Sequence, residues 1–303
     1  MQIARLPART GFRWVLDGFR ILRRQPIALV AIVFMNLALM ALSMLVPLVG
    51  SLGPLILTPL FMVGMMEAAR MAEAGTNPSP ATLFIGFRAQ SGQAWKPLVL
   101  LGVINALATL LALAVSILAG GDLLMDLASG RKNPNDPAVS ESALLGAAFA
   151  FAIVYLPVQL ATWYAPLFIA WDRVPLVKAM FFSIAAILRN KWAFLTYALG
   201  WVAVAVIASL VLRLLNSLLA GSPTLWSIVL TPLWLIGITA VYCSFWATYR
   251  DAVDRSGAAG HMPPPSNPPS PEPPTEFNPP TSPEAKEPVP TQPPGGPNQP
   301  PTP

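Results

Sequence analysis

Charged residues are scarce in this chain. Only 11% of its 303 residues are Asp, Glu, Lys or Arg, whereas 54% are hydrophobic. In soluble globular proteins roughly a quarter of the residues are charged, so the deficit excludes an ordinary soluble domain. The apolar residues also run in blocks of about 20 or more, the length that a helix needs to cross a hydrocarbon layer about 30 Å thick. The composition therefore predicts an integral membrane protein.

Cysteine and histidine are almost absent. The single cysteine, Cys243, lies in an apolar block, and the single histidine, His261, lies in a proline-rich segment. One cysteine excludes an intramolecular disulfide, and one of each excludes a His/Cys zinc site within the chain. A Cys-His or Ser-His-Asp catalytic set likewise has no support. We therefore predict no catalytic, cofactor-binding or metal-binding residues, no cofactor and no nucleic-acid partner.

Six apolar blocks are long enough to span a membrane. They cover about 26–46, 52–71, 97–119, 143–171, 192–215 and 224–249. Continuous apolar runs lack the alternation of a membrane β-barrel, and only a helix then satisfies the backbone within lipid. The sequence thus predicts an all-α, polytopic transmembrane bundle. It divides into a basic amphipathic segment at 1–25, a membrane domain at 26–250 and a proline-rich tail at 251–303.

The positions of lysine and arginine predict the orientation of the spans, because positive residues gather on the cytoplasmic side. If the N-terminus is cytoplasmic, all but three of the 19 Lys and Arg residues fall on that side; the exceptions are Arg131, Lys132 and Arg213. We therefore expect a bacterial inner-membrane protein with both termini in the cytoplasm. Interfacial rings are expected at the inner ends of the spans (Trp95, Trp171, Trp192, Trp246, Tyr249) and at one outer end (Trp226).

The segment before the first span has the pattern of an amphipathic helix in the headgroup plane. One predicted face holds Phe12, Val15, Leu16, Phe19 and Leu22, and the opposite face holds Arg13, Asp17, Arg20 and Arg24. Similar segments at 82–97 and 175–192 precede the third and fifth spans. The even-numbered spans share TPLF (58–61), APLF (165–168) and TPLW (231–234). We interpret these as three repeats, each an interfacial helix followed by a two-span hairpin; the alternative is ordinary clustering of such residues at membrane edges.

Two stretches resemble a known family. TWYAPLFIAWDRVPLVKAMFFSIAAILRNKWAFLTYALGW (162–201) looks like the signature segment of an uncharacterised family of six-helix inner-membrane proteins from Gram-negative bacteria. PARTGFRW (7–14) and RRQP (23–26) are similar to the opening of that family. The resemblance covers about 1–250. It implies a topology but no reaction, and it assigns no residue a catalytic role.

Five polar residues within the spans form a candidate intramembrane site: Glu67, Arg70, Asn36, Asn105 and Gln159. Glu67 and Arg70 are three residues apart and could neutralise each other inside the bundle as an ion or proton site. Alternatively, the second span ends near residue 66, and Glu67, Arg70 and Glu73 form a solvated helix end. The amides could line a polar pathway or simply bond between helices. Four prolines, namely Pro59, Pro157, Pro166 and Pro232, should kink or break their helices.

Contacts outside the bundle are predicted for the basic corners and for the tail. Anionic lipid could bind Arg13, Arg20, Arg23, Arg24, Arg189 and Lys191, although orientation alone would explain these charges. Nearly half of the residues from Pro263 onwards are proline, which predicts disorder, with a cytoplasmic protein partner as one possible role. The leading hypothesis is a non-enzymatic, envelope-related protein that acts through packing and partners. The alternative is a small-solute or lipid transporter that uses the polar site.

Overall fold

The computed structural model describes residues 2–45, 49–121, 141–218 and 223–254, with single positions 123, 126, 129 and 131. The chain separates into two compact units, residues 1–259 and 260–303, and all described residues lie in the first. The predicted start of the tail at 251 is too early, because residues 251–254 complete α11 and form a short strand. The rest of the tail, with Arg255 and Lys286, and the side chain of Trp226 lie outside the described residues.

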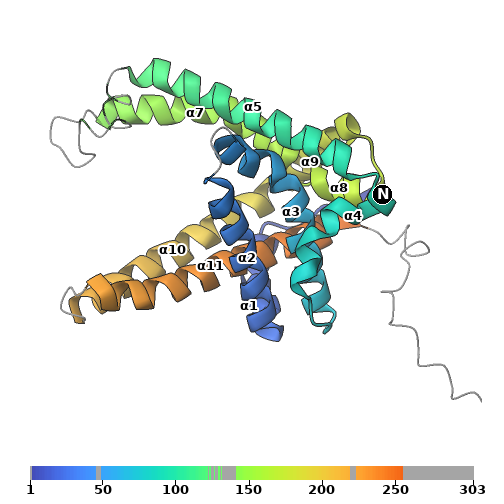
Figure 1. Cartoon of the computed structure of the whole chain (residues 1–303), viewed down its shortest axis with the longest axis horizontal. Coiled ribbons are helices and arrows are strands. Elements are labelled where there is room, and N and C mark those ends of the chain that lie inside the picture. The colour runs from blue at the N-terminus through green and yellow to red at the C-terminus, as the bar shows by residue number, and fades with distance from the viewer. Residues whose placement is uncertain are drawn as a thin grey trace, which may run out of the picture. The chain divides into compact units, whose positions relative to one another are not determined.

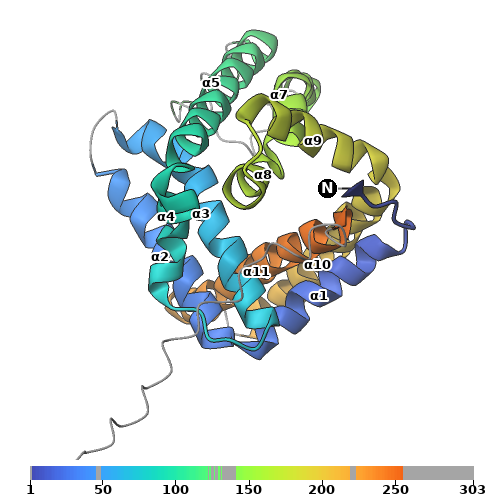
Figure 2. The ribbon, with the colours of Figure 1, turned by 90° about the vertical axis from the view of Figure 1, so that its right-hand side faces the viewer.

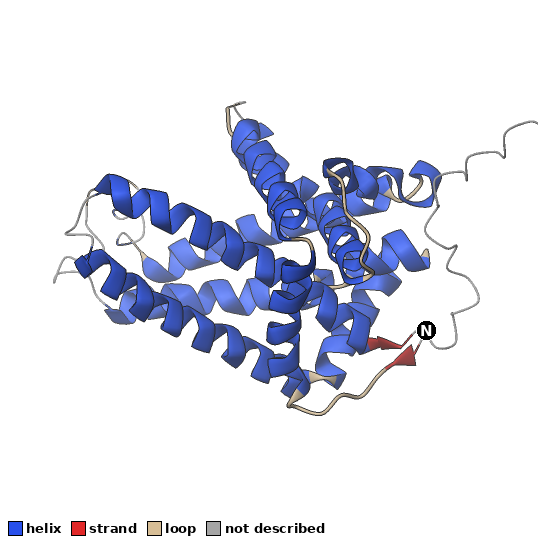
Figure 3. Ribbon diagram, turned by 90° about the horizontal axis from the view of Figure 1, so that it is seen from below, coloured by secondary structure: helices blue, strands red, loops and turns tan. Residues whose placement is uncertain are grey.

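The described part of the chain is helical except for two short strands (Figures 1 and 3). The elements in chain order are β1 (Gln2–Ile3), α1 (Thr10–Arg24), α2 (Pro26–Ser43), α3 (Val49–Glu73), η1 (Pro80–Phe84), α4 (Ile85–Gly92), α5 (Trp95–Gly120), α7 (Glu141–Thr162), α8 (Ala165–Asp172), α9 (Leu176–Arg189), α10 (Lys191–Leu218), α11 (Pro223–Ala252) and β2 (Val253–Asp254). The predicted all-α class is confirmed.

Six segments are long and apolar enough to cross a membrane, as predicted. They are Pro26–Ser43, Leu52–Glu73, Trp95–Gly120, Glu141–Asp172, Lys191–Leu215 and Leu230–Ala252. The fourth of these is not one helix, because α7 ends at Thr162 and α8 begins at Ala165, directly before Pro166. Pro59, Pro157 and Pro232 lie inside continuous helices. The predicted break therefore occurs at Pro166, where the ring occupies the first turn of a new helix.

A helix precedes each of the first, third and fifth spans. Single residues, Gln25 and Asn190, join α1 to α2 and α9 to α10, and two residues, Gln93–Ala94, join α4 to α5. The segment within 82–97 is less regular than predicted. Its backbone leaves helical geometry at Ala89, Gln90 and Ser91, and the last two have positive φ.

The helix α1 packs against α10 and α11 (Figure 2). Trp14, Ile21 and Leu22 face this contact and are at most 5% exposed. Gly11 and Gly18 allow the backbones to approach closely, since a Cβ at Gly11 would overlap the carbonyl oxygen of Ala193 and one at Gly18 that of Ala240. Small residues at such crossings bring helices together where lipid gives no hydrophobic driving force.

The short helix α8 is almost wholly buried. Residues Ala165 to Ala170 are all buried, and α8 contacts α3, α4, α5, α7 and α9. Around its start, Tyr164 lies 5.4 Å from Tyr249 and 6.2 Å from Phe194 between ring centroids. These rings continue to Trp14, which lies 5.4 Å from Phe194. Edge-on aromatic contacts of this kind add about 0.5–1.5 kcal/mol per pair beyond the area they bury.

The two ends of the described chain lie side by side. Strand β1 pairs with β2 in antiparallel register, with Gln2 opposite Asp254 and Ile3 opposite Val253. Asn190, between α9 and α10, accepts a hydrogen bond from the Leu6 amide at 2.9 Å and donates one to the Ala4 carbonyl at 2.9 Å. The N-terminal strand is thus fixed both to the end of the last span and to the start of the fifth.

Candidate functional site

Glu67 and Arg70 form an ion pair within α3. The Arg70 Nε donates to Glu67 Oε2 at 2.9 Å, and a terminal guanidinium nitrogen reaches Oε1 at 2.5 Å. Glu67 is 7% exposed, and α3 continues to Glu73. The helix continues past residue 66, and packing covers the Glu67 carboxylate, whereas the Arg70 side chain is 34% exposed. An end of the span near residue 66 stays a prediction.

The three predicted amides are not joined to this pair by any hydrogen bond among the described residues. Asn36 is 4% exposed, and its Oδ1 has no partner in the described part of the chain. The same holds for Asn105 Oδ1, whereas Gln159 Oε1 accepts a hydrogen bond from the Thr162 hydroxyl at 3.1 Å. The structure thus brings together Glu67 and Arg70 and leaves the amides as separate polar points in α2, α5 and α7.

An apolar recess lies between α2, α3 and α11. Its volume is about 10 Å³, roughly the space that one water molecule needs. The lining residues are Leu29, Ile32, Val33, Met65, Ala68, Thr239, Tyr242 and Cys243. None of the five predicted site residues lines it. Within the described ranges, no three His, Cys, Asp or Glu side chains are grouped as metal ligands.

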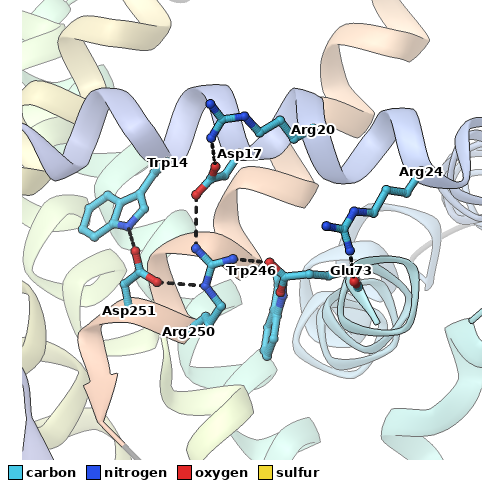
Figure 4. A network of polar contacts seen from close by, with 8 residues as sticks. All are labelled: Trp14, Asp17, Arg20, Arg24, Glu73, Trp246, Arg250 and Asp251. Atoms are coloured by element: carbon cyan, nitrogen blue, oxygen red, sulfur yellow. Dashed lines mark hydrogen bonds and ion pairs between the residues drawn. The ribbon is translucent and has the colours of Figure 1, made fainter. Parts of the chain in front are cut away.

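The densest set of polar contacts surrounds Arg250, at the end of α11 (Figure 4). Its Nε donates to Asp251 Oδ1 at 2.8 Å, and one terminal nitrogen donates to Asp17 Oδ2 of α1 at 3.1 Å. The other terminal nitrogen donates to Glu73 Oε1 of α3. One guanidinium therefore binds a carboxylate from α1, one from α3 and one from its own helix, α11. Arginine suits this position because its donors form a rigid planar fork.

Further donors occupy the remaining carboxylate oxygens. Arg20 donates to Asp17 Oδ1 at 2.6 Å, Trp246 Nε1 to Glu73 Oε2 at 2.6 Å, and Trp14 Nε1 to Asp251 Oδ2 at 3.0 Å. Arg24 donates to the Glu73 carbonyl. We call this set the Arg250 network; it comprises Trp14, Asp17, Arg20, Arg24, Glu73, Trp246, Arg250 and Asp251. Each oxygen of its three carboxylates accepts a hydrogen bond, so the network is closed on itself.

Sequence reasoning did not identify the Arg250 network. Asp17 was expected on the polar face of a surface helix, Arg250 was used only to predict the orientation, and Glu73 was considered only as part of a solvated end of the second span. The available signal was weak, namely acidic residues at the predicted inner membrane edge among many arginines. Three of the rings predicted at inner ends of spans pack against one another: Trp246 and Tyr249 are 6% and 1% exposed, and Trp171 contacts both. Trp95 and Trp192 are 42% and 62% exposed, as interfacial rings should be.

The predicted faces of α1 need correction. Val15 and Leu22 are 5% exposed and turn towards α10 and α11, together with Trp14. Phe12 and Leu16 are 48% and 54% exposed. The apolar residues therefore belong to two different faces, because protein and not lipid covers the larger one. The six basic candidates for lipid contact, Arg13, Arg20, Arg23, Arg24, Arg189 and Lys191, are all exposed.

Comparison with known proteins agrees with this architecture. No family model and no solved structure matches the chain. A probable inner membrane protein of Burkholderia thailandensis is 36% identical over 252 residues, which are 82% of this chain and 93% of that protein. With six candidate spans, the chain is a multi-pass protein in contact with the lipid bilayer. It belongs to the same family as this inner membrane protein of a Gram-negative bacterium, as the resemblance in the sequence predicted.

Proposed function

We propose that this protein is a non-enzymatic component of the inner membrane that acts through its architecture and its partners in the cell envelope. The observation that carries the proposal is the closed Arg250 network. Every carboxylate oxygen in it already has a donor from the protein. Polar groups saturated in this way favour a fixed arrangement of helices, whereas a catalytic acid or base needs a reactive oxygen within reach of its substrate.

The proposed architecture consists of three two-span hairpins, each preceded by a helix at the membrane interface. The positions of α1, α4 and α9 directly before α2, α5 and α10 support it. The shared TPLF, APLF and TPLW motifs are used differently, since APLF is buried throughout whereas Leu233 and Trp234 of TPLW are 44% and 55% exposed. The repeat would therefore be one of backbone arrangement more than of side-chain packing.

Both termini are proposed to be cytoplasmic. The pairing of β1 with β2 supports a common side for residue 2 and residue 254. The gathering of lysine and arginine on that side supports the cytoplasm, because positive residues resist translocation. The proline-rich tail would then be available to a cytoplasmic partner.

A second candidate function, transport of a small solute or lipid, is favoured by the unpaired amides. Asn36 Oδ1 and Asn105 Oδ1 are buried without a described hydrogen-bond partner. A buried acceptor left unsatisfied costs about 1–3 kcal/mol, so a polar ligand that bonds to it would be stabilised. This candidate requires that the amides and the Glu67–Arg70 pair act together.

The two candidates predict different outcomes for a deletion strain complemented with variants. We expect E67Q/N105A/Q159A to restore the envelope barrier, measured as detergent sensitivity, because a scaffold needs the fold and not these polar groups.

Deletion of residues 256–303 should instead weaken crosslinking of the protein to its partners in native membranes.

The matched control is E141Q, which removes an exposed carboxylate at the start of α7. If the triple variant reaches normal amounts in the membrane but fails to complement, while E141Q succeeds, the scaffold proposal is wrong and transport is favoured.

A further inference from the structure

The exposed side of α1 combines large apolar side chains with unusually many arginines. At about 100° per residue, the exposed positions occupy one arc of roughly 120° that begins at Phe12 and ends at Arg24. The members of this arc are Phe12, Arg13, Leu16, Arg20, Arg23 and Arg24. We call it the α1 strip. The rest of the helix is committed to packing on α10 and α11 and to the Arg250 network.

The arginines of the α1 strip are only partly used within the protein. Arg20 binds Asp17, yet its side chain is 64% exposed, and Arg24 donates to the Glu73 carbonyl. Arg13 and Arg23 form no ion pair with any described residue and are exposed. Arg13 and Arg23 thus leave their guanidinium donors available to a ligand, whereas Arg20 and Arg24 use part of theirs within the protein.

The position of the α1 strip defines what it can meet. One residue, Gln25, separates α1 from the first membrane span, which begins at Pro26. Ile27, in the first turn of that span, is 86% exposed in the absence of lipid. A helix joined so closely to a span lies at the membrane surface, where Phe12 and Leu16 can enter the acyl boundary and arginines can reach phosphates.

We propose that the α1 strip binds the phosphate groups of anionic phospholipids, with Arg13 and Arg23 as its main contacts and Phe12 and Leu16 as its apolar anchor. This rests on the proposed placement of α1 at the cytoplasmic interface. The packing of Trp14, Ile21 and Leu22 supports binding indirectly, because it fixes the opposite side of α1 and so leaves Arg13 and Arg23 exposed. The occupant is a lipid headgroup, since positive charge and exposed apolar area occur on the same arc.

The test uses the full chain purified in a non-ionic detergent and titrated with short-chain phosphatidylglycerol or with phosphatidylcholine of the same chain length. Bound lipid is counted by native mass spectrometry. We expect the anionic lipid to bind more tightly than phosphatidylcholine. R13Q/R23Q should weaken its binding about 25-fold, because each arginine at the membrane surface contributes about fivefold. Raising the salt concentration from about 0.05 M to about 0.5 M should weaken the binding of the anionic lipid and leave the binding of phosphatidylcholine unchanged.

The control R88Q/K178Q removes two exposed positive charges elsewhere in the described chain and should change the dissociation constant less than about twofold. F12S/L16S should weaken the binding of both lipids by similar factors, because the two lipids share the same acyl chains. Equal losses in R13Q/R23Q and R88Q/K178Q would mean a net-charge effect and would overturn the proposal. So would equal affinity of the wild type for the two lipids at low salt. Neither result bears on complementation, so the proposed function is tested separately.

Discussion

Arg250 shows how one side chain can connect three helices. It lies on α11 and binds Asp17 of α1 and Glu73 of α3, besides its neighbour Asp251. Its side chain is 32% exposed, so solvent screens part of each attraction. The contribution comes mainly from geometry: directed hydrogen bonds to charged acceptors fix the middle of α1 and the end of α3 relative to the end of α11.

Replacing Arg250 by glutamine should therefore destabilise the protein by about 2–3 kcal/mol, because three carboxylates lose their shared donor and repel one another. The measurement is the free energy of unfolding in detergent, by denaturant titration. R250K is the matched control: it keeps the charge but not the planar fork, and it should lose about half as much. A wild-type stability for R250Q would show that the network is incidental to the fold.

The sequence predicted the Glu67–Arg70 ion pair but not the Arg250 network. Glu67 and Arg70 are three residues apart on one helix, so helical geometry alone brings them together. Arg250 and Asp17 are 233 residues apart, and Trp14 and Asp251 are 237 apart. Such partners are chosen by tertiary packing, about which the local sequence carries little information.

Among the helices, the fourth span illustrates how a break in a membrane helix is compensated. Where α7 gives way to α8, the Leu160 carbonyl and the Tyr164 amide lose their helical partners. The Ser183 hydroxyl of α9, fully buried, accepts from the Tyr164 amide at 3.0 Å and donates to the Leu160 carbonyl at 2.6 Å. One side chain from a neighbouring helix thus satisfies both groups, as buried backbone requires.

We expect S183A to lower stability by about 1–3 kcal/mol, since it leaves a buried donor and a buried acceptor unpaired. The thermal unfolding midpoint in detergent measures this. S209A provides a matched control, because the Ser209 hydroxyl is exposed and bonds only to the Val206 carbonyl of its own helix. If S183A and S209A unfold at the same temperature, Ser183 does not hold the break together.

The break itself could be predicted from Pro166, because proline lacks the amide that continues a helix. The role of Ser183 could not be predicted, because the sequence does not show which small polar residue of a neighbouring helix lies at the break. The faces of α1 were misjudged for a related reason. Periodicity identifies an apolar stripe but does not say whether lipid or protein covers it, and in α1 protein covers Val15 and Leu22.

For the whole molecule, the number of spans was predictable and their packing was not. The length of each apolar run identifies a span, and the six predicted runs correspond to six helical segments long and apolar enough to cross a membrane. Which helices touch is decided by small residues and shape, because lipid tails are as apolar as leucine. The contact between α1 and α10, for instance, depends on Gly11 lying against Ala193.

The proposed orientation can be tested by cysteine labelling in a Cys243→Ala background. Cys243 is 1% exposed, so its removal should not alter the surface. We expect a membrane-impermeant maleimide to label S129C in intact spheroplasts, and R9C and S79C only after lysis, because basic segments stay in the cytoplasm. All three positions are exposed. The opposite pattern would invert the topology, and labelling of R9C and S79C on different sides would contradict the first two-span hairpin.

The docking of α1 on α10 and α11 has a consequence for biosynthesis. The ribosome makes α1 long before α11, and the hydrogen-bond partners of Trp14 and Asp17 on α11 follow only with residues 250 and 251. At 5–20 residues per second, roughly 10–50 s pass before they exist. During that interval α1 lacks α11 and the ion pair between Asp17 and Arg250, and the membrane surface is the environment available to it. Helix α1 is therefore made early but is among the last elements to reach its final place.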